Sequence, residues 1–203
     1  MAVITISRQF GAGGRTLGAM VAEKLNYQFL DDDVLQELSK RTRATKESVA
    51  DMENIAGGLF SKVISTILSK NYMERIIGVN SGYLDEDIYV ETLKAVITDL
   101  AQKDNVVLLG RGSQYILAGH ENALHFLLIA DKAQRIRFMQ RHYRISDKQA
   151  LHAVQAGEKR RNHVYKKLGA TSYDDPSVYH MVLNMSRLTL EEALTQIVTL
   201  VKK

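Results

Sequence analysis

The chain has 203 residues, of which 45% are hydrophobic and 25% charged, with a net charge of +4. This composition is typical of a globular domain with a core and excludes a disordered chain. The absence of cysteine excludes disulfides, zinc–thiolate sites and a cysteine nucleophile. Because no stretch approaches the roughly 18 apolar residues of a membrane span, and residues 1–6 lack the basic start of a signal peptide, we expect a cytoplasmic protein without membrane contact.

The first half of the chain predicts two strands and several helices. Residues 3–6 form a short β-branched run that favours a buried strand, and a glycine cluster follows it. Leu17, Val21 and Leu25 recur at helical spacing, which predicts a helix over 15–25. The next predicted elements are a strand at 27–30 that ends at three aspartates, helical pieces over 34–78 interrupted by Gly57-Gly58, and a helix at 88–102.

The second half continues the alternation. Residues 106–109 contain no polar side chain, which indicates a strand buried on both faces, as in a parallel sheet. The remaining predicted elements are strands at 124–129 and 179–184, a helix at 131–144, and helices that open at the capping boxes Ser146–Gln149 and Thr189–Glu192. Five strands that alternate with helices predict an α/β fold, with a parallel, doubly wound sheet and helices on both faces. His125, inside an apolar strand, is expected to be a core histidine.

The positive charge is concentrated in residues 132–167, called the basic block below. The block holds 11 lysines and arginines and two acids, for a charge of +9, whereas the rest of the chain carries −5. Such a block indicates an anionic partner, which could be a polyphosphate, a nucleic acid or an anionic membrane, unless it is only a solvated helical face. Only Phe138, Tyr143 and Tyr165 are aromatic there, so nucleic acid is the less favoured partner.

Residues 7–16, called the phosphate loop below, read Ser-Arg-Gln-Phe-Gly-Ala-Gly-Gly-Arg-Thr between a predicted strand and a predicted helix. Glycines allow positive φ and a close approach of the backbone to an anion, and successive N–H groups at a helix N-terminus bind phosphate oxygens. A tight strand-to-helix turn without a ligand is the alternative. The predicted phosphate-binding residues are Arg8, Gly11, Ala12, Gly13, Gly14, Arg15 and Thr16.

The loop departs from the usual pattern G-x-x-x-x-G-K-[ST] at two positions. Arg8 occupies the first glycine position and Gly14 occupies the lysine position. The lysine normally draws charge off the β- and γ-phosphates, and either Arg15 or Arg8 could substitute for it, although neither side chain starts from the same Cα.

Several stretches, taken together, resemble the cytidylate kinase-like family, a bacterial branch of the nucleoside monophosphate kinases. Ile4-Thr-Ile-Ser-Arg-Gln-Phe-Gly-Ala-Gly-Gly-Arg resembles the family's opening. Residues 27–31, 106–112 and 179–186 resemble its second strand with an acidic end, its strand followed by Gly-Arg, and its last strand. True cytidylate kinases read G-A-G-K-G-T in the loop, so that Gly14-Arg15 here replaces Lys-Gly.

The resemblance implies one P-loop kinase domain, a nucleoside monophosphate kinase fold with a five-stranded parallel sheet. Its expected parts are a core (1–30, 104–131 and 176–203), a helical acceptor-binding region over about 31–103, and a mobile basic lid over about 132–170. It implies an ATP-dependent phosphotransferase that uses Mg²⁺ and ATP, with Thr16 reaching Mg²⁺ or an α-phosphate oxygen.

The resemblance also implies roles for single side chains. Arg111 would hold the acceptor, and Asp31 or Asp32 would contact the acceptor or a metal-bound water, although an acid there could also only cap a helix. The lid arginines would close over the transferring group and exclude water. Arg137, Arg141 and Arg144 share a predicted helix face. The predicted catalytic residues are Arg15, Arg137, Arg141 and Arg161.

Three functions stay open at this point. The first is an active kinase for a nucleoside monophosphate. The second is a regulatory nucleotide-binding protein with little kinase activity, because the phosphate loop lacks its lysine. The third is a nucleic-acid binder that uses the basic block. Residues 31–100 match true cytidylate kinases poorly, so the acceptor could be another monophosphate or a non-nucleotide hydroxyl, and the apolar segment at 57–78 would suit a homodimer.

Overall fold

The computed structural model describes residues 2–31, 34, 36–38, 41, 86–170 and 172–202. The helical pieces predicted over 34–78, the apolar segment at 57–78 and the aspartate Asp32 therefore lie wholly or almost wholly outside the described residues.

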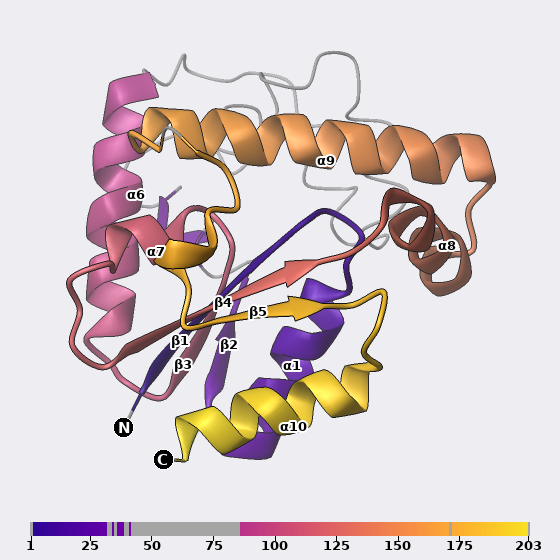
Figure 1. Cartoon of the computed structure of the whole chain (residues 1–203). Helices are drawn as coiled ribbons and strands as arrows, with labels where there is room; N and C mark the ends of the chain where they lie inside the picture. Colours follow the sequence, from indigo (N-terminus) through magenta and orange to yellow (C-terminus); the bar gives the residue numbers. More distant parts are fainter. Residues whose placement is uncertain are drawn as a thin grey trace.

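A five-stranded parallel sheet is the centre of the molecule (Figure 1). Its strands run in the order β2-β3-β1-β4-β5 and comprise β1 (Val3–Arg8), β2 (Gln28–Leu30), β3 (Val106–Leu109), β4 (Ala123–Ile129) and β5 (Met181–Asn184). The central strand β1 pairs with β3 through Val3↔Val106 and with β4 through Val3↔Ala123. The prediction of a parallel α/β sheet is confirmed. The last strand begins two residues later than predicted, because a 3₁₀ turn at Pro176–Val178 and its flanking residues come first.

Helices cover both faces of this sheet because successive strand residues point to opposite sides. Ile4, Val107 and Phe126 join one buried cluster with α1 and α10, whereas Val3 and Val106 join a second cluster with α6. The helices are α1 (Gly14–Leu25), α6 (Glu86–Ala101), α7 (Ser113–Ile116), α8 (Lys132–Tyr143), α9 (Asp147–Lys167) and α10 (Leu190–Val201). The sequence did not predict α7, since four residues are too few to show a helical period.

The basic block forms a helical pair, α8 and α9, beyond the carboxyl ends of β1 and β4 (Figure 1). Met139 of α8 and Ala150, Ala153 and Val154 of α9 are buried between the two helices. Helix α9 opens at the predicted capping box, in which the Gln149 backbone N–H donates to Ser146 Oγ at 3.3 Å. Phe10 of the phosphate loop packs against the same cluster, so these two helices contact the loop directly.

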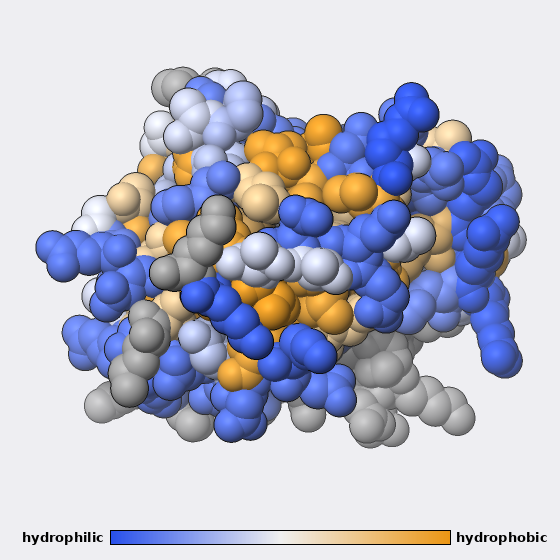
Figure 2. Space-filling model, turned by 60° about the horizontal axis from the view of Figure 1, so that its bottom comes forward, coloured by the Kyte–Doolittle hydropathy of each residue, from blue (hydrophilic) through white to orange (hydrophobic). Residues whose placement is uncertain are grey.

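The surface in Figure 2, which brings the bottom of Figure 1 forward, shows hydrophobic patches broken up by hydrophilic side chains. The largest exposed apolar side chains among the described residues are Tyr173 and Val182, at 40% and 36% exposure. The homodimer was predicted from the apolar segment at 57–78, which lies outside the described residues, so it stays a prediction. Within the part of the chain that the structure describes, no helix combines the length and the apolar character that a bilayer crossing needs.

Candidate functional site

The phosphate loop leaves the carboxyl end of β1 and enters α1 through two glycines with left-handed backbones. Gly11 has φ +88° and Gly13 has φ +83°, values that favour glycine because a side chain would be strained there. Gly13 is the N-cap of α1 and no side chain caps the helix, so the first N–H groups of α1 stay available to a ligand. Position 11 is also tight, because a Cβ there would lie 3.0 Å from the Arg135 carbonyl oxygen. The loop therefore has the backbone form of an anion site.

Two cavities lie on either side of the phosphate loop, and Gly11 and Gly13 line both. The first cavity, of about 160 Å³, lies among β1, α1, the end of β3, α8 and α9. The second cavity, of about 410 Å³, lies between α8 and the segment that joins β5 to α10. An elongated ligand whose phosphates rest on the loop could therefore reach into both.

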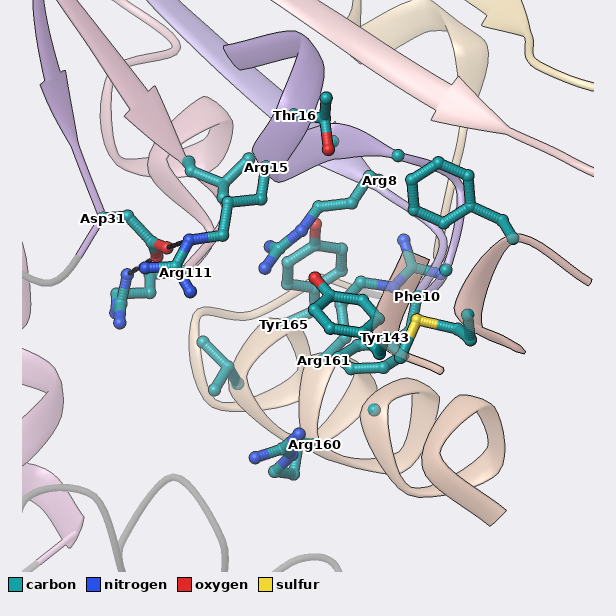
Figure 3. A pocket seen from close by; sticks show the side chains of 18 residues that line it. Arg8, Phe10, Arg15, Thr16, Asp31, Arg111, Tyr143, Arg160, Arg161 and Tyr165 are labelled. Carbon is teal, nitrogen blue, oxygen red and sulfur yellow. Dashed lines mark hydrogen bonds and ion pairs between the residues drawn. The ribbon is translucent and has the colours of Figure 1, made fainter. Parts of the chain in front are cut away.

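Arginines dominate the first cavity (Figure 3). Its charged lining consists of Arg8, Arg15, Asp31, Arg111, Arg160 and Arg161. Asp31 forms an ion pair through each of its carboxylate oxygens: Oδ2 lies 3.2 Å from Arg15 Nε, and Oδ1 lies 3.2 Å from Arg111 Nη1. Arg111 has φ +53°, a left-handed backbone that is strained for arginine and is typical of functional positions. The surplus of guanidinium groups makes this cavity suited to an anion with more than one charge.

Burial changes the acid–base properties of groups in this cavity. Loss of solvent lowers the pKa of Arg8, and the charges of Arg111 and Arg161 lower it further, while Asp31 opposes the shift. Burial also raises the pKa of the Tyr143 hydroxyl. The Tyr165 hydroxyl is buried and has no hydrogen-bond partner among the described residues, although its side chain lines the cavity. A buried hydroxyl without a partner costs free energy that a bound ligand would recover.

A carboxylate of α9, that of Glu158, links the phosphate loop to both α8 and α9. Glu158 Oε1 accepts the Phe10 backbone N–H at 2.6 Å and Arg135 Nη1 at 3.0 Å, and Glu158 Oε2 accepts Arg161 Nη2 at 2.8 Å. Arg161 also binds both carboxylate oxygens of Asp174. Burial would lower the pKa of Arg161, but the bonds to Asp174 and the charge of Glu158 outweigh it and raise that pKa.

The fit of Phe10 against α9 depends on a glycine. A Cβ at Gly157 would lie 2.1 Å from Phe10 Cγ, so the ring occupies the space of a side chain at that position. The Arg160 guanidinium lies 5.9 Å from the centre of the same ring, within the range of a cation–π contact. Backbone bonds, ring packing and ion pairs thus join the loop to α9.

The second cavity is more apolar than the first. Ala130, Phe138, Met185, Leu188 and Leu190 supply most of its apolar lining. The rings of Phe138 and His142 stack there, with centroids 5.2 Å apart and planes 11° apart. Arg137 and Arg141 line the same cavity from the exposed side of α8. A flat ring system would find an apolar surface and a stacking partner here.

The structure brings most of the predicted site residues together. Lining the first cavity are Arg8, Gly11, Gly13, Gly14, Arg15, Thr16, Asp31, Arg111 and Arg161. Ala12, Arg137 and Arg141 line the second cavity instead, so the predicted catalytic arginines divide between the two sides of the loop. Their roles stay predictions, and Asp32 lies outside the described residues.

Other site residues were missed by sequence reasoning. Glu158 and Phe10 meet across 148 positions of sequence, and Gln9 Nε2 donates to Asp174 Oδ2 across 165 positions at 3.3 Å. Glu158 could have been noticed as one of the two acids inside the basic block. Nothing local to the phosphate loop signals its contacts with α9.

Comparisons with known proteins give the family and the fold. Residues 3–187 match the model of the cytidylate kinase-like family. An uncharacterized protein from Eubacterium ventriosum ATCC 27560 has a similar structure, with a TM-score of 0.69 at 17% identity over 99% of this chain and 98% of that one. Shikimate kinase from Bacteroides thetaiotaomicron gives a TM-score of 0.53 at 16% identity over 100% and 99% of the two chains.

A further structural neighbour is shikimate kinase from Acinetobacter baumannii in complex with shikimate, with a TM-score of 0.50 at 16% identity over 100% of this chain and 93% of that one. A search of curated protein sequences found no match. The fold is the P-loop NTPase fold of kinases, as the sequence predicted.

Proposed function

We propose that this chain, which belongs to the cytidylate kinase-like family, transfers the γ-phosphoryl group of ATP to a nucleoside monophosphate. The observation that carries the proposal is the position of the phosphate loop between an arginine-lined cavity and a larger, more apolar one. Phosphoryl transfer needs little covalent work from a protein and depends on positioning and on neutralising charge. Both requirements match what these two cavities offer.

The donor nucleotide would span the loop. Its phosphates would bind the N–H groups of residues 11–16, and its base would enter the second cavity beside Phe138. Arg137 and Arg141 would then approach the donor from α8, which is the role we propose for these two predicted catalytic arginines. The basic block as a whole would act as the lid over the nucleotide and exclude water.

The acceptor would bind in the first cavity. We propose that Arg111 and Arg15 hold its phosphate and that Arg161 neutralises charge on the transferring group. Asp31 would orient Arg15 and Arg111 through its two ion pairs, and these bonds favour that role over contact with a metal-bound water. Asp32 is proposed as a further contact of the acceptor on the strength of the family resemblance alone.

Magnesium would enter with the nucleotide. The described residues include no group of three side chains that could hold a metal ion, and Thr16 lines the first cavity from the first turn of α1. One hydroxyl next to a phosphate site fits an ion that keeps most of its ligands from water and substrate phosphates. When bound, Mg²⁺ would neutralise phosphate charge, and Thr16 is the residue proposed to contact it.

Transfer of labelled γ-phosphate from Mg-ATP tests this function. CMP, dCMP, UMP, AMP and GMP would be supplied separately to the wild type, to Arg111→Ala and, as a control, to Lys103→Ala, which removes an exposed cation from the turn between α6 and β3. We expect transfer to one monophosphate, loss of transfer in Arg111→Ala and retention in Lys103→Ala. No transfer to any of the five would contradict the proposed function.

A nucleotide-binding protein with little activity is the second candidate, and Gly14 in the lysine position is the observation that favours it. Its signature would be tight ATP binding, measured by calorimetry, without transfer to any acceptor. A nucleic-acid partner is disfavoured, because the three aromatic side chains of the basic block, Phe138, Tyr143 and Tyr165, are half-buried or buried and offer no row of exposed rings on which successive bases could stack.

A further inference from the structure

The two positions at which the phosphate loop departs from the usual pattern lie against each other in space. A Cβ at Gly14 would lie 2.7 Å from Arg8 Cγ and 3.1 Å from both Arg8 Cβ and Arg8 Cδ. Contacts under 3.0 Å do not occur between real side chains, so the stem of Arg8 fills the space into which a lysine at position 14 would extend. A side chain at position 14 would therefore require Arg8 to move.

A second glycine, Gly110, lies against the guanidinium end of the Arg8 side chain. A Cβ at Gly110 would lie 1.9 Å from Arg8 Nη1, so the guanidinium rests on the backbone at the carboxyl end of β3. The side chain therefore runs from the end of β1, past the first residue of α1, to the end of β3. Figure 3 shows the guanidinium projecting into the first cavity below the start of α1, near the Tyr165 ring. We call this place, beneath the phosphate loop and between the ends of β1 and β3, the floor of the loop.

The charge of Arg8 is not matched by the protein. The Arg8 side chain makes no hydrogen bond or ion pair with any residue that the structure describes, although its backbone belongs to the β1–β4 ladder. Arg111 and Arg161 add like charges around it, while Asp31, already bonded to two other arginines, offers only a partial counterweight. The buried Tyr165 hydroxyl, without a partner in the described structure, lines the same cavity. A guanidinium with open donors beside an unpaired hydroxyl would be stabilised by a bound anion.

Arg15 is less suited to replace the lysine. Its side chain is 40% exposed, and its Nε is paired with Asp31 at 3.2 Å on the acceptor side of the cavity. Arg15 therefore points away from the floor of the loop, where the lysine of an ordinary phosphate loop lies under the terminal phosphates.

We propose that Arg8 is the cation that replaces the missing lysine and contacts the terminal phosphates of the nucleotide, with positions 8 and 14 having exchanged glycine and cation. Gly14 and Gly110 supply the space for its stem and its guanidinium. A guanidinium offers five donors in a planar fork and can bind two phosphate oxygens at once, which an ammonium cannot do with the same geometry. This inference rests on the proposed nucleotide site but not on the transfer reaction.

Calorimetric binding tests the inference with three probes, which are Mg-ATP, inorganic tripolyphosphate and adenosine. Arg8→Gln should weaken Mg-ATP and tripolyphosphate at least about tenfold, because it removes charge-assisted bonds to phosphate, and should leave adenosine unchanged. Gly14→Lys should also weaken both phosphate probes, because the new side chain collides with Arg8. The double variant Arg8→Gly/Gly14→Lys should bind both more tightly than either Arg8→Gln or Gly14→Lys, because it restores the usual pattern.

Two further variants separate charge from folding. Lys103→Gln, which removes an exposed cation from the turn between α6 and β3, should bind all probes as the wild type does. Arg8→Lys should retain part of the phosphate affinity, because it keeps the positive charge. If the double variant recovers phosphate affinity, the single variants lost affinity because the binding site changed and not because the chain misfolded. Thermal unfolding of each variant gives the independent check.

Each outcome decides the question. Wild-type affinity of Arg8→Gln for Mg-ATP would overturn the inference and leave the proposed function intact. If Arg8→Gln loses phosphate binding while the wild type transfers no phosphate to any acceptor, the inference would be supported and the proposed kinase function would be contradicted. A double variant no better than the single ones would overturn the exchange of positions. A wild type that binds neither Mg-ATP nor tripolyphosphate would overturn both proposals.

Discussion

Replacing Glu158 with alanine should loosen the phosphate loop from α9. The carboxylate accepts the Phe10 backbone N–H at 2.6 Å, Arg135 at 3.0 Å and Arg161 at 2.8 Å, and its side chain is 24% exposed. Alanine would leave a backbone donor without its partner and two largely buried guanidinium groups with less compensation. Among the described residues, Arg161 would keep its bonds to Asp174, whereas Arg135 would keep only its bond to the Phe10 carbonyl at 3.3 Å.

The size of the effect follows from these contacts. A hydrogen bond to a charged group contributes about 1.5–3 kcal/mol, but three bonds to one carboxylate do not add, and partial exposure screens them. We therefore expect Glu158→Ala to lower the free energy of unfolding by about 3 kcal/mol. For a chain of 203 residues this corresponds to a fall in Tm of about 6–12 °C. Glu158→Gln keeps an acceptor for Phe10 and should cost about half as much.

Urea and thermal unfolding of the two variants give the measurement. Glu121→Ala, which removes an exposed glutamate from the turn before β4, is the matched control. If Glu158→Ala were within about 0.5 kcal/mol of that control, the spread expected for surface changes, the loop would not be held by this carboxylate and the reasoning would fail.

Three other changes test other parts of the structure. Gly157→Ala should cost about 1–3 kcal/mol of stability by displacing the Phe10 ring, whereas Gly119→Ala, with open space around it, should cost little; equal unfolding midpoints would contradict the packing. Burial, aided by neighbouring His180, lowers the pKa of His125 from 6.5 to about 4, so only the unfolded chain takes up the proton between these values. Stability should therefore fall by about 2.5 kcal/mol as pH falls from 6.5 to 4, and His125→Gln should remove that dependence in urea titrations at fixed pH. Thr189→Ala should cost about 1 kcal/mol through loss of the N-cap of α10, and an unchanged urea midpoint would exclude the cap.

The strands and the parallel sheet could be predicted because their signals are local. The run at 106–109 is apolar throughout, and all four residues are buried in β3. The two capping boxes placed the starts of α9 and α10 correctly. His125 is a core histidine as predicted, with Nδ1 2.8 Å from Thr5 Oγ1. The order of the strands could not be predicted, because short strands of similar composition give no sign of which neighbours they choose.

The candidate site was predicted only where it lies within one stretch of sequence. The phosphate loop could be recognised because its motif lies within ten consecutive residues. Its contacts with Glu158 and Asp174 could not, because they form only when distant parts of the chain pack together.

Helical spacing grouped Arg137 with Arg141 correctly, since both line the second cavity. The prediction that Arg144 shares their helix face was wrong, because α8 ends at Tyr143 and Arg144 follows it with a left-handed backbone (φ +54°) and does not line that cavity. That spacing could not show that Arg161, on the next helix, would face the opposite side of the loop.

The contact between Arg8 and Gly14 also limits how such a loop could have evolved. A lysine introduced at position 14 would meet the arginine stem 2.7 Å away, and a glycine introduced first at position 8 would leave no cation at either position. Each single change gives a loop that is expected to bind phosphate less well, so the two residues are expected to change together or not at all. Descendants of one loop type would then keep it while the rest of the chain diverges, which makes the pair of residues 8 and 14 a marker of lineage within P-loop kinases.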